Sequence, residues 1–191
     1  STVDVQLATS RDGLLWGRPE RVPIIERGEY ECVYSRRDLV ALTDEEWGLP
    51  FMGTHHRHDF KTYDNDEQSD ASAVEWRWAL WKHDRLVALE AQGEARFTMV
   101  QKLCHGTEMR LNYETERGGW VRVELVEPPV TPPEPVEPFP GYGLDAADPL
   151  AGDELSRVVT WNGRSDLSDL KDRLVSIRIH MARARLYSVF I

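Results

Sequence analysis

The chain has 191 residues and a formal net charge of −10, and 41% of its residues are hydrophobic. This length allows one large domain or two small ones, each with a packed core. The negative charge argues against nucleic acid as a partner, because such a chain repels phosphate backbones. No apolar run approaches the roughly 20 residues that span a bilayer, so no membrane partner is expected.

The first 60 residues predict a series of short strands. Apolar and polar residues alternate over 3–7, which indicates a half-buried strand. The Asp12-Gly13 pair between this strand and Trp16 predicts a hairpin, since glycine adopts the positive φ that primed turns need. Three further apolar runs follow. We interpret residues 1–60 as a β-meander.

The acidic, polar stretch 61–74 has almost nothing to bury, and we expect a linker or a long loop there. From residue 75 onward, about eight strand-like stretches follow at short, regular spacing, as in a sandwich or jelly roll. The sequence therefore predicts an all-β protein. An antiparallel, jelly-roll-like β-sandwich over 75–191 is preceded by the meander.

Proline dominates the sequence from Pro128 to Pro140. Proline cannot join a sheet ladder, so this segment is either a domain linker or a stiff loop. Alternating apolar faces lie on both sides of it, at 121–125 and 175–181. A lone hairpin cannot bury such a face, so we expect both faces in one core and the proline-rich segment as a surface loop.

Seven tryptophans suggest sugar binding, because sugar rings stack on indole faces. Trp76 and Trp78 share one face of a predicted strand. Trp120 and Tyr113 lie near a predicted turn at 117–119, where side chains are more often exposed. These four residues are the candidate carbohydrate-binding residues, with core packing as the alternative. Trp161 is expected in the core.

Two groups of residues could bind a metal ion. His56, His58 and Asp59 combine imidazole and carboxylate ligands that suit zinc, or else form a polar rim strand. Asp148 and Asp153 lie in a loop marked by glycine and proline, where carboxylates suit calcium. The alternative for this loop is a solvated acidic segment.

No nucleophile motif and no phosphate-binding loop occurs, so no catalytic residue is assigned. Glu31 and Asp38 are the first carboxylates to inspect for a glycosidase pair. Cys32 and Cys104 are far apart in the sequence and are expected to be free buried thiols, with a disulfide as the alternative.

Two segments resemble known carbohydrate-active proteins. The sequence VQLATSRDGLLW at 5–16 resembles the blade hairpin of five-bladed β-propeller glycoside hydrolases related to β-fructosidases and arabinosidases. The stretch 76–191 resembles the β-sandwich that follows the propeller in bacterial glycoside-hydrolase-like proteins. Its matching motifs are 83–89, 111–113, 121–125, 149–153, 159–163, 166–168 and 186–190.

The resemblance implies a non-catalytic C-terminal region, because such proteins carry their catalytic carboxylates in earlier propeller blades. It implies packing on a propeller domain or on another copy of the chain, and binding of an oligo- or polysaccharide. We expect a secreted or periplasmic location. Two alternatives remain: a hydrolase fragment whose site is completed by another chain, and a structural module without a ligand.

Overall fold

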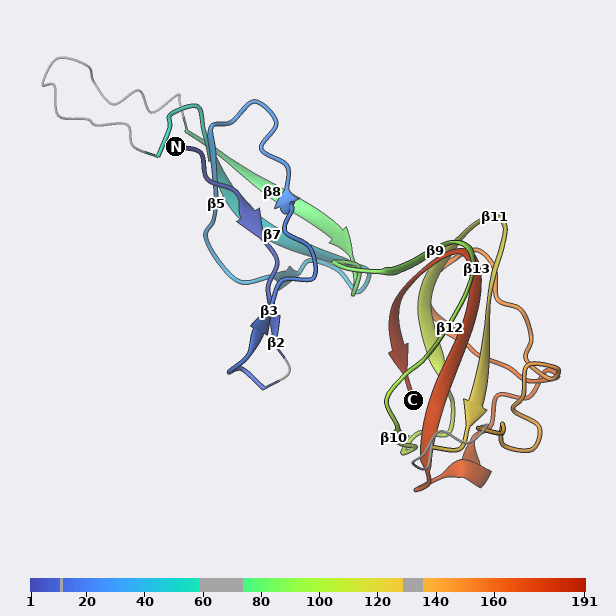
Figure 1. The fold of residues 1–191 in the computed structure, drawn as a ribbon. Helices are drawn as coiled ribbons and strands as arrows, with labels where there is room; N and C mark the ends of the chain where they lie inside the picture. The colour runs from blue at the N-terminus through green and yellow to red at the C-terminus, as the bar shows by residue number, and fades with distance from the viewer. Residues whose placement is uncertain (11, 59–73, 129–135) are drawn as a thin grey trace, which may run out of the picture. The chain divides into compact units, whose positions relative to one another are not determined.

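The computed structural model describes residues 1–10, 12–58, 74–128 and 136–191, and it shows an all-β chain with antiparallel sheets (Figure 1). The expected all-β, sandwich-like class is confirmed. The chain divides into two compact units, Ser1–His83 and Asp84–Ile191. Over the described ranges, no helix is long and apolar enough to cross a membrane.

The first unit consists of six short strands and two nine-residue strands. In chain order, these are β1 (Val5–Gln6), β2 (Thr9–Ser10), β3 (Trp16–Gly17), β4 (Pro23–Ile25), β5 (Cys32–Ser35), β6 (Val40–Ala41), β7 (Glu46–Thr54) and β8 (Val74–Lys82). The predicted hairpin at Asp12-Gly13 is confirmed, since β2 pairs with β3. Its turn is held by Asp12, whose Oδ1 accepts the Leu14 and Leu15 N–H groups at 2.8 and 2.9 Å.

Strand β7 is the centre of the main sheet of the first unit. β5 and β6 both pair with it along one edge, and β8 pairs with it along the other. One face of this sheet packs on a buried core, to which Ala79 and Trp81 of β8 also contribute. The fully or largely buried members of this core are Ile25, Tyr30, Val33, Leu49 and Phe51.

The boundary between the units differs from the one expected at residue 75. β8 pairs with β7 over its whole length, from Thr54↔Val74 to Glu46↔Lys82, so it belongs to the first unit. The sequence indicated this strand but contained no local signal for its partner. The expected linker at 61–74 lies outside the described residues, apart from Val74, which begins β8.

The second unit is built from one five-stranded sheet. Its strands are β9 (Leu89–Thr98), β10 (Lys102–Leu103), β11 (Arg110–Val126), β12 (Asp153–Val158) and β13 (Leu174–Phe190). β13 pairs with β11 along one edge and with β9 and β10 along the other, and β12 pairs with β11. A short 3-10 turn at Ser168–Leu170 precedes β13.

The two 17-residue strands fold over at a shared corner. Figure 1 shows β13 rising through one layer and returning through the other to the C-terminus. The β11–β13 register shifts between Thr115 and Trp120, and Arg183 of β13 has a φ of 45°. Bulges bend strands and increase their twist, so one sheet forms both layers of the sandwich.

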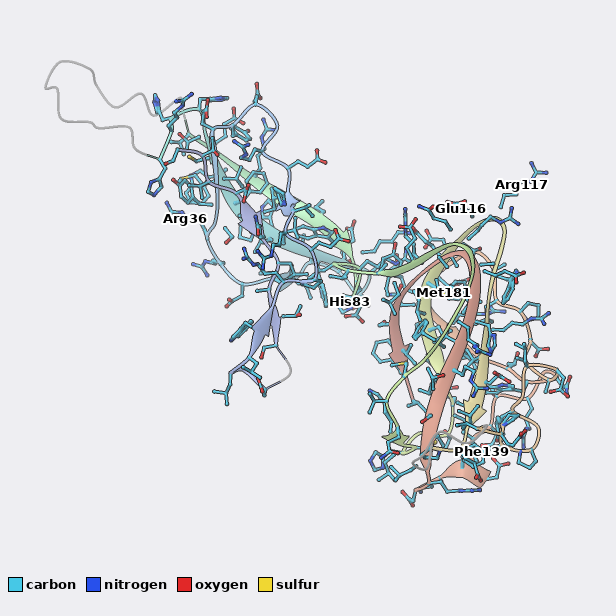
Figure 2. The ribbon with its side chains drawn as sticks, viewed as in Figure 1. Arg36, His83, Glu116, Arg117, Phe139 and Met181 are labelled. Carbon is cyan, nitrogen blue, oxygen red and sulfur yellow. The ribbon has the colours of Figure 1, made fainter. Side chains whose placement is uncertain are left out.

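The corner corrects one detail of the sequence-based prediction and confirms another. Residues 117–119 are a bulge inside β11 and not a turn between two strands; Glu116 and Arg117 project outward there (Figure 2). The stretches 121–125 and 175–181 share one core, as expected, and they are neighbours in one ladder, with Val123 opposite Ile179.

The core of the second unit lies between the layers. Trp161 is buried there, as expected, and its Nε1 donates to the Val123 carbonyl at 2.8 Å. Cys104 is buried in the same core and Cys32 in the first unit, and both are free thiols, as expected. The other large side chains that are fully buried here are Met109, Leu111, Tyr113, Leu125, Tyr142, Leu167, Ile177, Ile179 and Met181.

Both flanks of the proline-rich segment belong to the second unit, as expected for a loop. Residues 129–135 lie outside the described ranges. After them, the chain follows the free edge of β11: Phe139 N–H donates to the Leu125 carbonyl at 2.9 Å, and Leu150 exchanges two hydrogen bonds with Val121. This segment therefore covers an edge that would otherwise be open to pairing.

Gly119 tests the corner. A Cβ atom there would collide with the carbonyl oxygens of Arg183 and Ala182, the latter at 2.8 Å. We expect Gly119→Ala to lower the free energy of unfolding of the second unit by about 1–3 kcal/mol, as overpacking does. Gly93→Ala is the matched control, because a Cβ at Gly93 meets nothing within 4 Å. Urea denaturation of both variants checks this prediction. Equal free energies of unfolding for the two variants would contradict the close backbone packing at Gly119.

Candidate functional site

Strand β8 exposes a row of large apolar side chains. Trp76, Trp78 and Leu80 are 63%, 52% and 54% exposed, and all three point to the same side because strand side chains alternate. Their cross-strand partners on β7 are Met52, Pro50 and Gly48. We define the aromatic face as the side chains on this side of the sheet: Tyr34, Val40, Leu42, Pro50, Met52, Trp76, Trp78 and Leu80.

A glycine allows the apolar end of the aromatic face to lie flat on the sheet. A Cβ atom at Gly48 would come within 2.6 Å of Leu42 Cδ1 and 2.8 Å of Trp78 Cε3. Both side chains thus close over the bare backbone. Leu42, at 43% exposed, and Val40, at 39%, continue the surface beside Leu80. The result is a contiguous apolar surface next to the two indoles.

Positively charged residues border the other end of the aromatic face. The Arg36 guanidinium lies 5.6 Å from the centre of the Trp76 ring, and its Nη2 is 3.5 Å from Met52 Sδ. Next to it is a hollow of about 390 Å³. The lining residues are Tyr34, Arg36, Met52, Thr54, His56, Arg57, His58 and Val74.

The structure brings two of the predicted groups onto this one side of the first unit. Trp76 and Trp78 are exposed on the aromatic face, and His56 and His58 line the hollow. The His58 ring lies 6.4 Å from the Tyr34 ring. The alternation at 76–80 was visible in the sequence. The contribution of Arg36 was not, because it depends on β5 and β8 both pairing with β7.

The other two carbohydrate candidates lie in the second unit. Tyr113 is only 1% exposed and its hydroxyl donates to the Ala151 carbonyl at 3.3 Å, so the expectation that it presents a ring to a ligand is wrong. It belongs to a continuous strand, which buries it. Trp120 is half-buried, with the Arg122 guanidinium 5.7 Å from its ring centre.

The described residues contain no group of three potential ligands placed to hold a metal ion. Asp59 of the proposed zinc site lies outside the described ranges. Asp148 Oδ2 accepts from Thr160 Oγ1 at 2.6 Å and from Gly163 N–H at 2.8 Å, and these bonds hold its pKa below the usual range. Asp153 Oδ1 is 2.7 Å from Arg85 Nη2. Both carboxylates of the proposed calcium site thus serve the protein's own structure.

The two carboxylates considered for catalysis have different surroundings. Glu31 Oε2 lies 3.8 Å from Arg57 Nε, and Asp38 is exposed between β5 and β6. A glycosidase needs two carboxyl groups about 5–10 Å apart across the scissile bond. The eight residues that define the aromatic face carry no charge. On the same side of the sheet, Arg36 lies beside Trp76, and Glu46 pairs with Lys82 at the far end, beyond Gly48 and Leu80.

A ladder of alternating charges covers the outer side of the second unit. Arg85, with a side chain only 6% exposed, contacts Asp153 and Glu114 and donates to Asn112 Oδ1 at 2.8 Å. Arg185 then joins Glu114 to Glu90 at 2.8 and 3.2 Å. Because each of these carboxylates is matched by a guanidinium, the ladder stabilises the layer. Sequence reasoning missed it, since its members come from distant strands.

Among the described residues of the second unit, Glu124 is the most enclosed carboxylate, with an 8% exposed side chain. It accepts from His180 Nε2 at 2.7 Å, Arg178 Nη1 at 3.2 Å and Leu144 N–H at 3.1 Å. Burial by itself raises the pKa of Glu124, but these hydrogen bonds outweigh it and leave the pKa below its ordinary value. Glu124 therefore connects the segment that contains Leu144 to β13.

The chain was compared with protein-family models, with curated proteins and with solved structures, and none of them matches it.

The lowered pKa of Glu124 predicts a pH-dependent contribution to stability. This contribution is present above its ordinary pKa of 4.5 and is lost as the pH falls through the lower folded value. We expect Glu124→Gln to destabilise the second unit at pH 7 by about 2 kcal/mol, as for hydrogen bonds to charged groups. The difference in the free energy of unfolding between this variant and the wild type should become smaller below pH 4.5.

The control for this experiment is Glu127→Gln, which removes an exposed carboxylate 3.7 Å from Arg173. Exposed ion pairs contribute about 0–1 kcal/mol, so this variant should unfold nearly as the wild type does. Urea denaturation at pH 7 and at pH 3.5 measures both variants. If Glu124→Gln lowers the free energy of unfolding by the same amount at both pH values, the proposed role of the ionised Glu124 carboxylate is wrong.

Proposed function

We propose that this chain is a non-catalytic, carbohydrate-binding region of a carbohydrate-active protein, and that the aromatic face is its sugar-binding surface. The single observation behind the proposal is the pair of exposed indoles, Trp76 and Trp78, two positions apart on one strand. Their opposite side is the buried core of the unit, so the outward direction of both rings is determined by packing.

The physical chemistry of sugars supports this proposal. A pyranose ring has an apolar C–H side that gains free energy when it stacks on an indole, while its hydroxyl groups stay at the edge of the contact. A strand of a packed sheet holds two such indoles in place, which lowers the entropy cost of binding. Tyr34 and Arg36 add polar groups at one end, as binding sites that orient a ligand commonly do.

A second candidate function is supported by the apolar end of the aromatic face. Val40, Leu42 and Leu80 are aliphatic, exposed and contiguous with Trp78, a composition typical of a surface that another protein covers. The occupant that fits is the apolar side of a further β-sheet, such as a propeller blade, because sheets pack face to face. In this case the chain is an accessory region that docks on a larger domain.

Substitution of the indoles tests the proposed function. Trp76→Ala and Trp78→Ala should each weaken polysaccharide binding about fivefold to tenfold, or about 1–1.4 kcal/mol. The double variant should show no detectable polysaccharide binding. Affinity electrophoresis in gels that contain soluble polysaccharides measures this. Trp16→Ala is the matched control, because Trp16 is 65% exposed in the same unit but lies on β3.

Full retention of the double variant by a polysaccharide would contradict sugar binding by the aromatic face, and so would no retention of the wild type by any polysaccharide. If the wild type is not retained, the second candidate function, docking on a larger domain, predicts that the wild type binds an apolar dye such as ANS. The double variant should then bind much less of the dye. Trp16→Ala should behave as the wild type in both assays.

A further inference from the structure

We infer that the aromatic face binds an acidic polysaccharide, with an anionic substituent of the sugar held by Arg36 beside Trp76. This inference rests on the proposed function and narrows its ligand class. It assigns different tasks to the two indoles: Trp78 stacks on a sugar ring, and Trp76 holds the Arg36 guanidinium, which receives the anionic group of the ligand.

Arg36 is placed to bind an anion at the end of the indole row. Tyr34, Met52 and Trp76 form one cross-strand row over β5, β7 and β8, and the Arg36 guanidinium reaches from β5 over this row to Trp76. Its contact with Met52 Sδ is with a weak acceptor, which leaves N–H donors for a ligand. Among the described residues, no carboxylate is within ion-pair distance of Arg36.

The hollow beside Arg36 is also lined by basic side chains. Its described lining contains Arg36, Arg57, His56 and His58 and no Asp or Glu. Of these, Arg57 is also 3.8 Å from Glu31. The formal net charge of the whole chain is −10, so this local set of basic side chains is opposite in sign to the chain as a whole. A planar guanidinium suits bidentate binding of a carboxylate or a sulfate group.

The geometry of a stacked sugar fits this division of tasks. A sugar ring that stacks on Trp78 directs its equatorial substituents outward from its own edge, towards the neighbouring side chains. One of these neighbours is Trp76, two positions along β8, with Arg36 beside it. A uronate carboxylate or a sulfate ester on the sugar supplies the required negative charge. A neutral sugar leaves the Arg36 donors to water.

The test compares polymers that share a backbone and differ only in charge. Polygalacturonate and fully methyl-esterified polygalacturonate form one pair, and dextran sulfate and dextran form the other. We expect the wild-type chain to be retarded in gels that contain the charged member of at least one pair, and much less by its neutral member. Arg36→Gln should weaken this binding about tenfold.

Arg37→Gln is the matched control, because it removes the same charge from the adjacent exposed residue. It should change the affinity less than twofold. Equal losses in both variants would show general charge attraction and would overturn the inference. Circular dichroism of both variants checks that the sheets are retained.

The remaining outcomes separate the inference from the proposed function. Equal retention by the charged and neutral members of each pair, lost in Trp78→Ala, would overturn the acidic-ligand inference and leave the proposed function intact. Retention by dextran sulfate alone, lost in Arg36→Gln but not in Arg37→Gln, supports the inference with sulfate as the anion. No retention by any polysaccharide would overturn the proposed function itself.

Discussion

The alternation of side chains along β7 and β8 is the constraint on which the candidate site depends. Ala79 and Trp81 pack on the core of the first unit, so Trp76, Trp78 and Leu80, which alternate with them along β8, must point the other way. The full-length pairing of β8 with β7 fixes this register. A slip by one residue would bury Trp78 and expose Trp81, at the cost of the whole core. The exposure of the two indoles is thus a consequence of how the first unit folds.

The second unit also buries one apolar face of its sheet, but it does so by folding that sheet over on itself. A single sheet bends at the Gly118–Gly119 bulge and at Arg183, so that two halves of the same strands face each other. The chain after the proline-rich segment then closes the edge of β11, and the ladder around Arg85 covers one outer surface. Its enclosed charged groups are matched within the unit, and this contrasts with Arg36 in the first unit.

Short-range signals predicted much of the fold. Alternation identified the strands at 121–125 and 175–181, and the Asp12-Gly13 pair predicted the first hairpin. The sequence did not show that β8 belongs to the first unit, because a strand's partner depends on contacts far along the chain. For the same reason, Tyr113 was expected beside a turn, whereas the bulge at 117–119 keeps β11 continuous and Tyr113 buried. That Trp76 and Trp78 share one strand face was predicted from local pattern alone, whereas the position of Arg36 beside Trp76 depends on the pairing of three strands.

The central claim is that the aromatic face is the ligand-binding surface of the chain. Its most direct test is the indole N–H region of a nitrogen–proton NMR spectrum, recorded during titration with an oligogalacturonate. The account predicts that the signals of Trp76 and Trp78 shift progressively, while that of Trp161, buried in the second unit, stays in place. Binding that shifts residues of the second unit and leaves Trp76 and Trp78 unchanged would contradict it.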